Sequence, residues 1–277
     1  MTIISLFHCS PQIIRDTPGL GDDLRAAGVI HLDVNAADVH ELPWCKGEGW
    51  RVVLIGDGIM RTREDRDKYC TEAKVIDIAT QTRESGICDG LELVDEMKQD
   101  PAYYERIPDF MRWWKYAGGP PVAFPGFETS RYHQWADYFS CQWKHDAAHN
   151  YKTRDAWMTG AINAVPHDGR RIGTVIPVYA NQYEKRVEGG TFRNGKDQLR
   201  NGGMNTKGIG NLMRKARQLG VEQFHLYALD TFWAQQRLDE PVGSRTLLQT
   251  GAGPHVDKRR WKQILAVCKE ITQGVNV

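Results

Sequence analysis

Carboxylate side chains stand out among the polar residues that follow short apolar runs of this chain. They are Asp33, Asp57, Asp95, Glu96, Glu128 and Asp230. Two carboxyl groups can cleave a glycosidic bond when one is protonated and the other is ionised. Carboxylates at such positions can also hold a divalent metal ion. The residue types therefore indicate acid chemistry of one of these two kinds, provided that the fold brings them together.

The elements that must position these acids are short strands alternating with helix-like segments. Eight apolar runs are typical of strands: 2–8, 29–33, 51–57, 90–94, 122–125, 173–179, 223–230 and 246–250. Segments 63–83 and 258–272 have helical spacing, and 131–164 is the longest connection. This rhythm in 277 residues predicts an α/β protein, a single (β/α)8 TIM barrel domain over 1–277. No Gly-x-Gly-x-x-Gly turn follows the first strand, so an open nucleotide-binding sheet is less favoured.

A barrel displays the residues at the carboxyl ends of its strands around one mouth. Beside the acids, aromatic and amide side chains at these ends fit a sugar, because pyranose faces stack on aromatic rings and hydroxyls hydrogen-bond to polar groups. Glu92 alternates with two leucines, so it faces either the barrel interior or the helices. The candidate substrate-binding residues are His8, Asp33, Asn35, Asp57, Glu92, Tyr179, Asn181, Gln182, Tyr227 and Trp233.

Asp95-Glu96 ends the fourth predicted strand, and Asp230 ends the seventh. This arrangement resembles the barrel glycoside hydrolases in which an acid/base Glu closes strand four and a carboxylate nucleophile closes strand seven. The resemblance implies that Glu96 is the proton donor. Asp230 departs from the pattern because Asp is one methylene shorter than Glu, which favours the wider carboxyl separation of an inverting enzyme, about 6.5–9.5 Å. Glu128 is the rival second carboxylate.

Other interpretations stay open at this point. Asp95 and Glu96 also suit the first turn of a helix. A metal-dependent lyase or isomerase would use His8, Asp33, Asp57 or Glu128, whereas His31 and His225 lie inside strands and are expected to be structural. The basic, Gly-rich run 185–210 has no interleaved aromatic residues, so a solvated loop is favoured over a phosphate or nucleic-acid site. A barrel that binds carbohydrate without cleaving it also fits.

Composition narrows the classes of partner. A net charge of +1 provides no overall field for nucleic acid or for an anionic membrane. No apolar run approaches the roughly 18 residues of a membrane span, and no basic leader precedes the first strand. The six cysteines form no C-x-x-C pair, so reduced thiols are expected, with Cys9 beside His8 as the one candidate for chemistry. We expect a carbohydrate substrate, no cofactor, and a location in the cytoplasm or outside the cell without a cleaved signal peptide.

Overall fold

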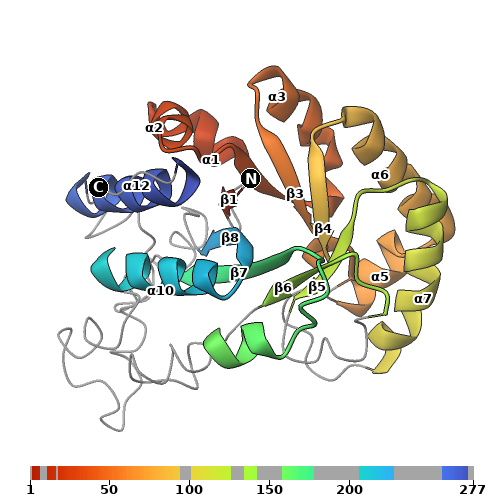
Figure 1. Cartoon of the computed structure of the whole chain (residues 1–277). Helices are drawn as coiled ribbons and strands as arrows, with labels where there is room; N and C mark the ends of the chain where they lie inside the picture. Colours follow the sequence, from red (N-terminus) through yellow and green to blue (C-terminus); the bar gives the residue numbers. More distant parts are fainter. Residues whose placement is uncertain are drawn as a thin grey trace, which may run out of the picture.

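Eight parallel strands close into a barrel in chain order, and the last strand pairs with the first. The computed structural model describes residues 2–6, 11–16, 18–60, 62–93, 101–125, 134–141, 158–177, 206–227 and 258–273. The strands are β1 (Ile3–Leu6), β2 (His31–Asn35), β3 (Arg51–Ile55), β4 (Cys88–Glu92), β5 (Val122–Pro125), β6 (Tyr138–Cys141), β7 (Ile172–Pro177) and β8 (Val221–Tyr227). The helices lie outside them (Figure 1). The predicted (β/α)8 TIM barrel is therefore confirmed.

The outer layer consists of helices between the strands. They are α1 (Pro11–Asp16), α2 (Leu20–Ala26), the 3-10 helix η1 (Ala36–Glu41), α3 (Leu42–Gly47), α4 (Asp57–Met60), α5 (Arg63–Tyr69), α6 (Glu72–Ser85), α7 (Pro101–Tyr116), α10 (Thr206–Gln218) and α12 (Lys258–Gln273), with one further helix at 158–163. The single helix predicted over 63–83 is two helices. Thr62 and Asp65 cap the first reciprocally, and the second starts after Thr71, whose backbone is extended.

Two strand predictions are wrong in position or number. The fourth strand begins at Cys88 and ends at Glu92, two residues before the predicted end. The sixth strand, β6, lies inside the segment 131–164 that was predicted as a connection. The runs predicted as strands six and seven are consequently β7 and β8. Residues 246–250, predicted as the eighth strand, lie outside the described residues.

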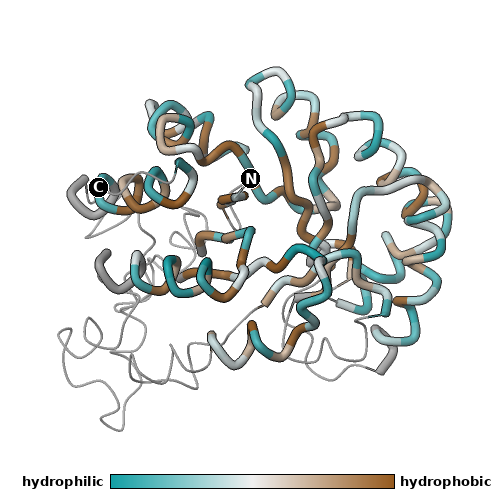
Figure 2. The backbone as a smooth tube through the Cα atoms, in the orientation of Figure 1, coloured by the Kyte–Doolittle hydropathy of each residue, from teal (hydrophilic) through white to brown (hydrophobic). Residues whose placement is uncertain are grey.

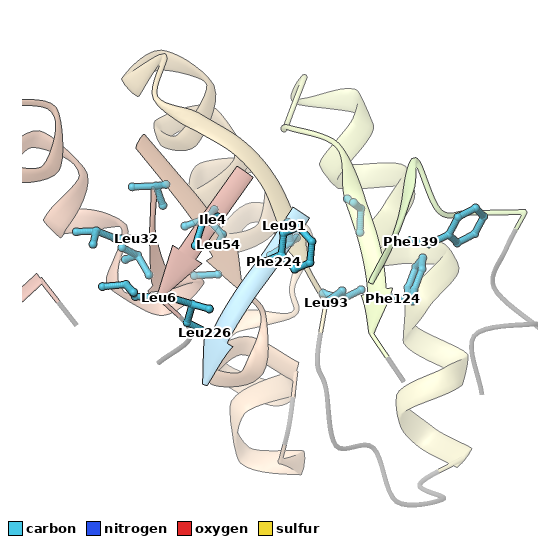
Figure 3. Packing of buried hydrophobic residues seen from close by; sticks show 14 of the residues in the cluster. Ile4, Leu6, Leu32, Leu54, Leu91, Leu93, Phe124, Phe139, Phe224 and Leu226 are labelled. Carbon is cyan, nitrogen blue, oxygen red and sulfur yellow. The ribbon is translucent and has the colours of Figure 1, made fainter. Parts of the chain in front are cut away.

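Outward-facing strand residues pack against the helices in one apolar cluster. Alternate residues of each strand supply it, such as Leu91 and Leu93 of the β4 region, as the period of two in a strand requires. Figure 2 shows hydrophobic residues concentrated along the strands, and Figure 3 shows part of the cluster, including Leu6, Phe124 and Leu226. Helix α7 buries four apolar residues that recur at helical spacing: Ile107, Phe110, Met111 and Trp114. The layer between strands and helices thus fixes the barrel.

Inside the barrel, one layer is built from small side chains. In a (β/α)8 barrel, four inward side chains from alternate strands share a layer, and each step of two strands shifts the register by two residues. The observed pairings place Ser5, Val53, Ala123 and Gly173 in one such layer. Barrel layers are usually filled by Val, Ile and Leu. This small-residue layer therefore leaves the centre to longer side chains from the layers beside it.

Gly90 shows how tightly one of those longer side chains fits. A Cβ atom at this position would lie 2.6 Å from the hydroxyl oxygen of Tyr138, which is fully buried. We expect Gly90→Ala to lower the free energy of unfolding by about 1–3 kcal/mol because the ring has to shift within a packed interior. Gly160→Ala is the control, since its Cβ meets nothing and Ala favours the helix by about 0.5–1 kcal/mol. Equal stability of the two variants in urea denaturation would contradict the packing argument.

Candidate functional site

A layer of polar side chains crosses the barrel directly above the small-residue layer, toward the carboxyl ends of the strands. Two inward residues lie in the same layer when the register leads from one to the strand two places on and then two residues toward its carboxyl end. Four such steps around the barrel return to the starting residue. The pairings followed are Asp33–Val53–Gly90, Glu92–Ala123–Tyr138, Ser140–Gly173–Gln223 and His225–Ser5–His31. The four residues, here called the polar layer, are Asp33, Glu92, Ser140 and His225, one from each even-numbered strand. All are buried.

His225 joins two carboxylates within the polar layer. Its Nδ1 lies 3.1 Å from Asp33 Oδ2 and 2.7 Å from Ser5 Oγ, and its Nε2 lies 2.5 Å from Glu92 Oε1. The side-chain amide of Gln223 packs against the same place, donating from Nε2 to Glu92 Oε1 at 3.3 Å. His225 Nε2 also lies 2.6 Å from Gln223 Nε2. Each ring nitrogen thus faces a carboxylate oxygen, and a doubly protonated ring donates one hydrogen bond to each. His225 is accordingly an imidazolium that bridges β2 and β4 from β8.

Electrostatics favour the same protonation state. Burial alone would lower the pKa of His225, but the charges of Glu92 and Asp33 and the hydrogen bonds to them raise it to about 10. Nearby, burial and the charge of Glu92 raise the pKa of Tyr138 well above its usual value, against the effect of Arg171. The Arg171 guanidinium packs over the Tyr138 ring, 4.1 Å from its centroid. The interior of the barrel is thus strongly charged although it is buried.

A separate ionic group closes the amino end of the barrel. Arg51 donates two short hydrogen bonds to the carboxylate of Asp89, and His31 Nε2 lies 2.8 Å from the same group. Burial would raise the pKa of Asp89, yet these hydrogen bonds hold it far below the usual range. The amino end of a barrel contributes to stability rather than to ligand binding. The prediction that His31 is structural agrees with this position.

The structure places three of the predicted site residues and the backbone of two more. Asp33 and Glu92 meet at His225, and Glu92 faces the interior, which decides between its two predicted orientations. Asn35 accepts a hydrogen bond from the backbone amide of Ala37 and thereby caps η1. Asp57 begins α4 and Tyr227 ends β8, but their side chains are not described. The remaining candidates lie outside the described residues: His8, Asp95, Glu96, Glu128, Tyr179, Asn181, Gln182, Asp230 and Trp233.

One assignment changes because of the extra strand β6. Asp230 was matched to the end of strand seven, but it follows Tyr227, the last residue of β8. Strand seven is Ile172–Pro177, and no acidic residue ends it. Asp230 therefore differs from the resemblance in two ways: it follows strand eight instead of strand seven, and its side chain is shorter than that of Glu. Glu96 keeps its relation to β4, which it follows by four residues, and Glu128 follows β5.

Sequence reasoning missed the residue at the centre of the polar layer. His225 was predicted to be structural because it lies inside a strand, and Ser5, Ser140 and Gln223 were not considered. The signal that could have found it is the alternation of polar and apolar residues along β8. Gln223 and His225 share one face of this strand, while Phe224 and Leu226 belong to the apolar cluster on the other face. Two successive polar residues on the inner face of a strand are unusual for a barrel, where bulky apolar residues predominate.

Comparisons with known proteins support the fold. No protein-family profile and no curated protein matches the sequence. The endo-beta-1,4-mannanase from Thermotoga petrophila is similar in structure, with a TM-score of 0.62 and 10% identity over 100% of this chain and 77% of that one. The GH113 beta-mannanase AaManA from Alicyclobacillus acidocaldarius gives 0.52 and 11% over 96% and 97%. A β-glucuronidase from Ruminococcus gnavus gives 0.59 and 8% over 97% of this chain but 48% of that one. The chain therefore shares the TIM-barrel fold of these glycoside hydrolases.

The described residues include neither a metal-binding cluster of His, Cys, Asp or Glu nor a membrane-spanning helix. No group of three or more His, Cys, Asp or Glu side chains in the described ranges is arranged to hold a metal ion. None of the helices that the structure describes is long and apolar enough to cross a membrane.

The charge of His225 makes a prediction about stability. Because its folded pKa of about 10 exceeds the unfolded value of about 6.5, its contribution is present in full below pH 6.5 and is lost as the pH rises through 10. We expect His225→Gln to cost about 3–5 kcal/mol at pH 7, since two buried carboxylates lose their partner. The difference from wild type, measured by urea denaturation, should shrink toward pH 10.

The control for this measurement is His40→Gln, which changes an exposed histidine of η1. Its difference from wild type should stay near zero from pH 7 to pH 10. A constant stability difference between wild type and His225→Gln over that range would show that His225 is uncharged in the folded protein.

Proposed function

We propose that this protein is a glycoside hydrolase that cleaves a glycosidic bond by carboxylate acid/base catalysis at the carboxyl-end mouth of the barrel. The observation that carries the proposal is the likeness of the whole barrel to mannanases and a glucuronidase, joined to the acids that follow β4, β5 and β8. A likeness at about 10% identity supports the fold alone, so the activity rests on the chemistry of these residues.

In the proposed mechanism Glu96 donates a proton to the leaving oxygen, with Asp95 beside it. A second carboxylate, Asp230 or Glu128, either attacks the anomeric carbon or activates a water molecule. Glu96 has to be protonated at the start, which requires a raised pKa, whereas its partner has to stay ionised. Stacking and hydrogen bonds to the sugar are assigned to the predicted residues His8, Asn35, Asp57, Tyr179, Asn181, Gln182, Tyr227 and Trp233. Asp33 and Glu92, which were also predicted to bind substrate, are left out because both are buried and bound to His225.

The strand count bears on which acid is the partner. Strands β4 and β5 are neighbours, whereas β4 and β8 lie on opposite sides of an eight-stranded ring. The outcome depends on the separation of the two carboxyl groups, roughly 5–5.5 Å in a retaining enzyme and roughly 6.5–9.5 Å in an inverting one. Asp230 is one methylene shorter than Glu, so Asp230 as partner favours the wider separation and inversion.

Glu96→Gln should leave the fold intact and lower turnover by at least about 100-fold, because the leaving oxygen loses its proton donor. The measurement is product release from a panel of oligo- and polysaccharides, beginning with β-1,4-mannan and aryl glucuronides. Glu105→Gln, which changes an exposed acid on α7, is the control and should retain wild-type rates. Full activity of the Glu96→Gln protein would refute its role.

Glu128→Gln and Asp230→Asn test the partner acid on the same substrates. We expect one of them to abolish turnover, since an amide can neither attack nor activate water. NMR of the first-formed product gives its anomeric configuration. Retention of configuration with an essential Asp230 would contradict the expectation of inversion.

Two other functions make different predictions. A metal-dependent lyase or isomerase would lose activity on chelation, with the ion held by His8, Asp33, Asp57 or Glu128. A non-catalytic carbohydrate-binding barrel would bind glycans saturably and release no product.

A further inference from the structure

The polar layer contains three buried oxygens that no described residue satisfies. Asp33 Oδ1, Glu92 Oε2 and Ser140 Oγ each lack a hydrogen-bond partner among the described residues, although the parent side chains are at most 2% exposed. A buried polar atom without a partner costs free energy of the order of 1–3 kcal/mol, so an orphan of this kind generally marks a bound water or ion. Here three orphans come from one layer and from three strands, β2, β4 and β6.

All three orphans are acceptors or hard oxygen ligands. Carboxylate and hydroxyl oxygens are the groups that alkali and alkaline-earth cations prefer in proteins. Both nitrogens of His225 are already occupied by Asp33 and Glu92, so the imidazole is not a candidate ligand. The chemistry of the free atoms therefore selects a hard cation over a transition metal.

Charge selects the valence of that cation. Two carboxylates and one imidazolium give the polar layer a formal charge of −1. Buried charge is costly unless it is paired. Arg171 does not neutralise it, since this residue precedes β7 at the amino end, is partly exposed, and donates to the backbone carbonyl of Asp89. One monovalent cation would bring the layer to zero, whereas a divalent ion would leave it positive.

The neighbouring layer consists of small side chains. Beneath the polar layer lie Ser5, Val53, Ala123 and Gly173, in place of the bulky residues that usually fill a barrel. We propose that the polar layer is a binding site for one monovalent cation, Na⁺, K⁺ or NH₄⁺, held by Asp33, Glu92 and Ser140. The site is independent of the proposed glycosidase activity, and it stabilises the barrel.

Thermal unfolding at constant ionic strength tests the site. The full-length protein is titrated from 1 to 100 mM NaCl, KCl or NH₄Cl against tetramethylammonium chloride, whose cation is too large to enter. A site with a Kd near 1 mM raises Tm by about 5 °C over this range. Glu92→Gln, which removes the net charge, should abolish the shift. Ser140→Ala keeps every charge and should weaken the apparent affinity by about 10-fold through loss of one ligand.

Asp89→Asn is the matched control, because it removes a partly buried carboxylate of the same barrel at the opposite end. It should lower Tm and keep the cation-dependent shift. Equal shifts with tetramethylammonium, or an unchanged shift in Glu92→Gln, would overturn the proposal.

A second measurement covers the case in which the Glu92 variant does not fold. Crystals of wild type soaked in rubidium chloride should give an anomalous peak among Asp33 Oδ1, Glu92 Oε2 and Ser140 Oγ. Density at that place without an anomalous signal identifies a water molecule, and it would also overturn the proposal.

Discussion

The interior of this barrel depends on one buried imidazolium. His225 stands between two carboxylates that come from strands to which β8 is not hydrogen-bonded, so their attraction ties β2, β4 and β8 together across the barrel. Desolvating three ionised groups is expensive, and it is offset only while all three remain paired. The same arrangement that links the strands therefore makes each member hard to replace singly. A barrel filled with branched aliphatic residues would have no such constraint.

Side-chain size has to match this charge. Histidine, glutamate and tyrosine are long, and they meet in a barrel whose adjoining layer contributes only Ser5, Val53, Ala123 and Gly173. Gly90 has the same role on β4, where its missing Cβ admits the hydroxyl of Tyr138. The small residues of one layer leave space inside the barrel, and the longer polar residues of the layers above and below fill it.

The outer face of each strand was predictable, and the inner face was not. The short apolar runs that alternate with helix-like segments predicted the barrel, and their apolar side chains pack against the helices. β6 was missed because its four residues, Tyr138–Cys141, lie in an aromatic stretch whose pattern did not separate strand from helix. The partnership of His225 with Asp33 and Glu92 joins residues 192 and 133 positions apart, and only the closed register brings them together. Local periodicity contains no information on such a pairing.

The two ends of the barrel show that satisfied and unsatisfied charges mean different things. At the amino end, both oxygens of Asp89 accept hydrogen bonds from Arg51, and His31 adds a third. That carboxylate is completed by the chain itself, as expected of a group that serves stability. In the polar layer, one carboxylate oxygen of Asp33 and one of Glu92 bind His225, and the other oxygen of each has no hydrogen-bond partner among the described residues. Folding alone gains nothing from a buried acceptor left open. The unpartnered acceptors are therefore better explained by the proposed bound cation than by the packing of the barrel.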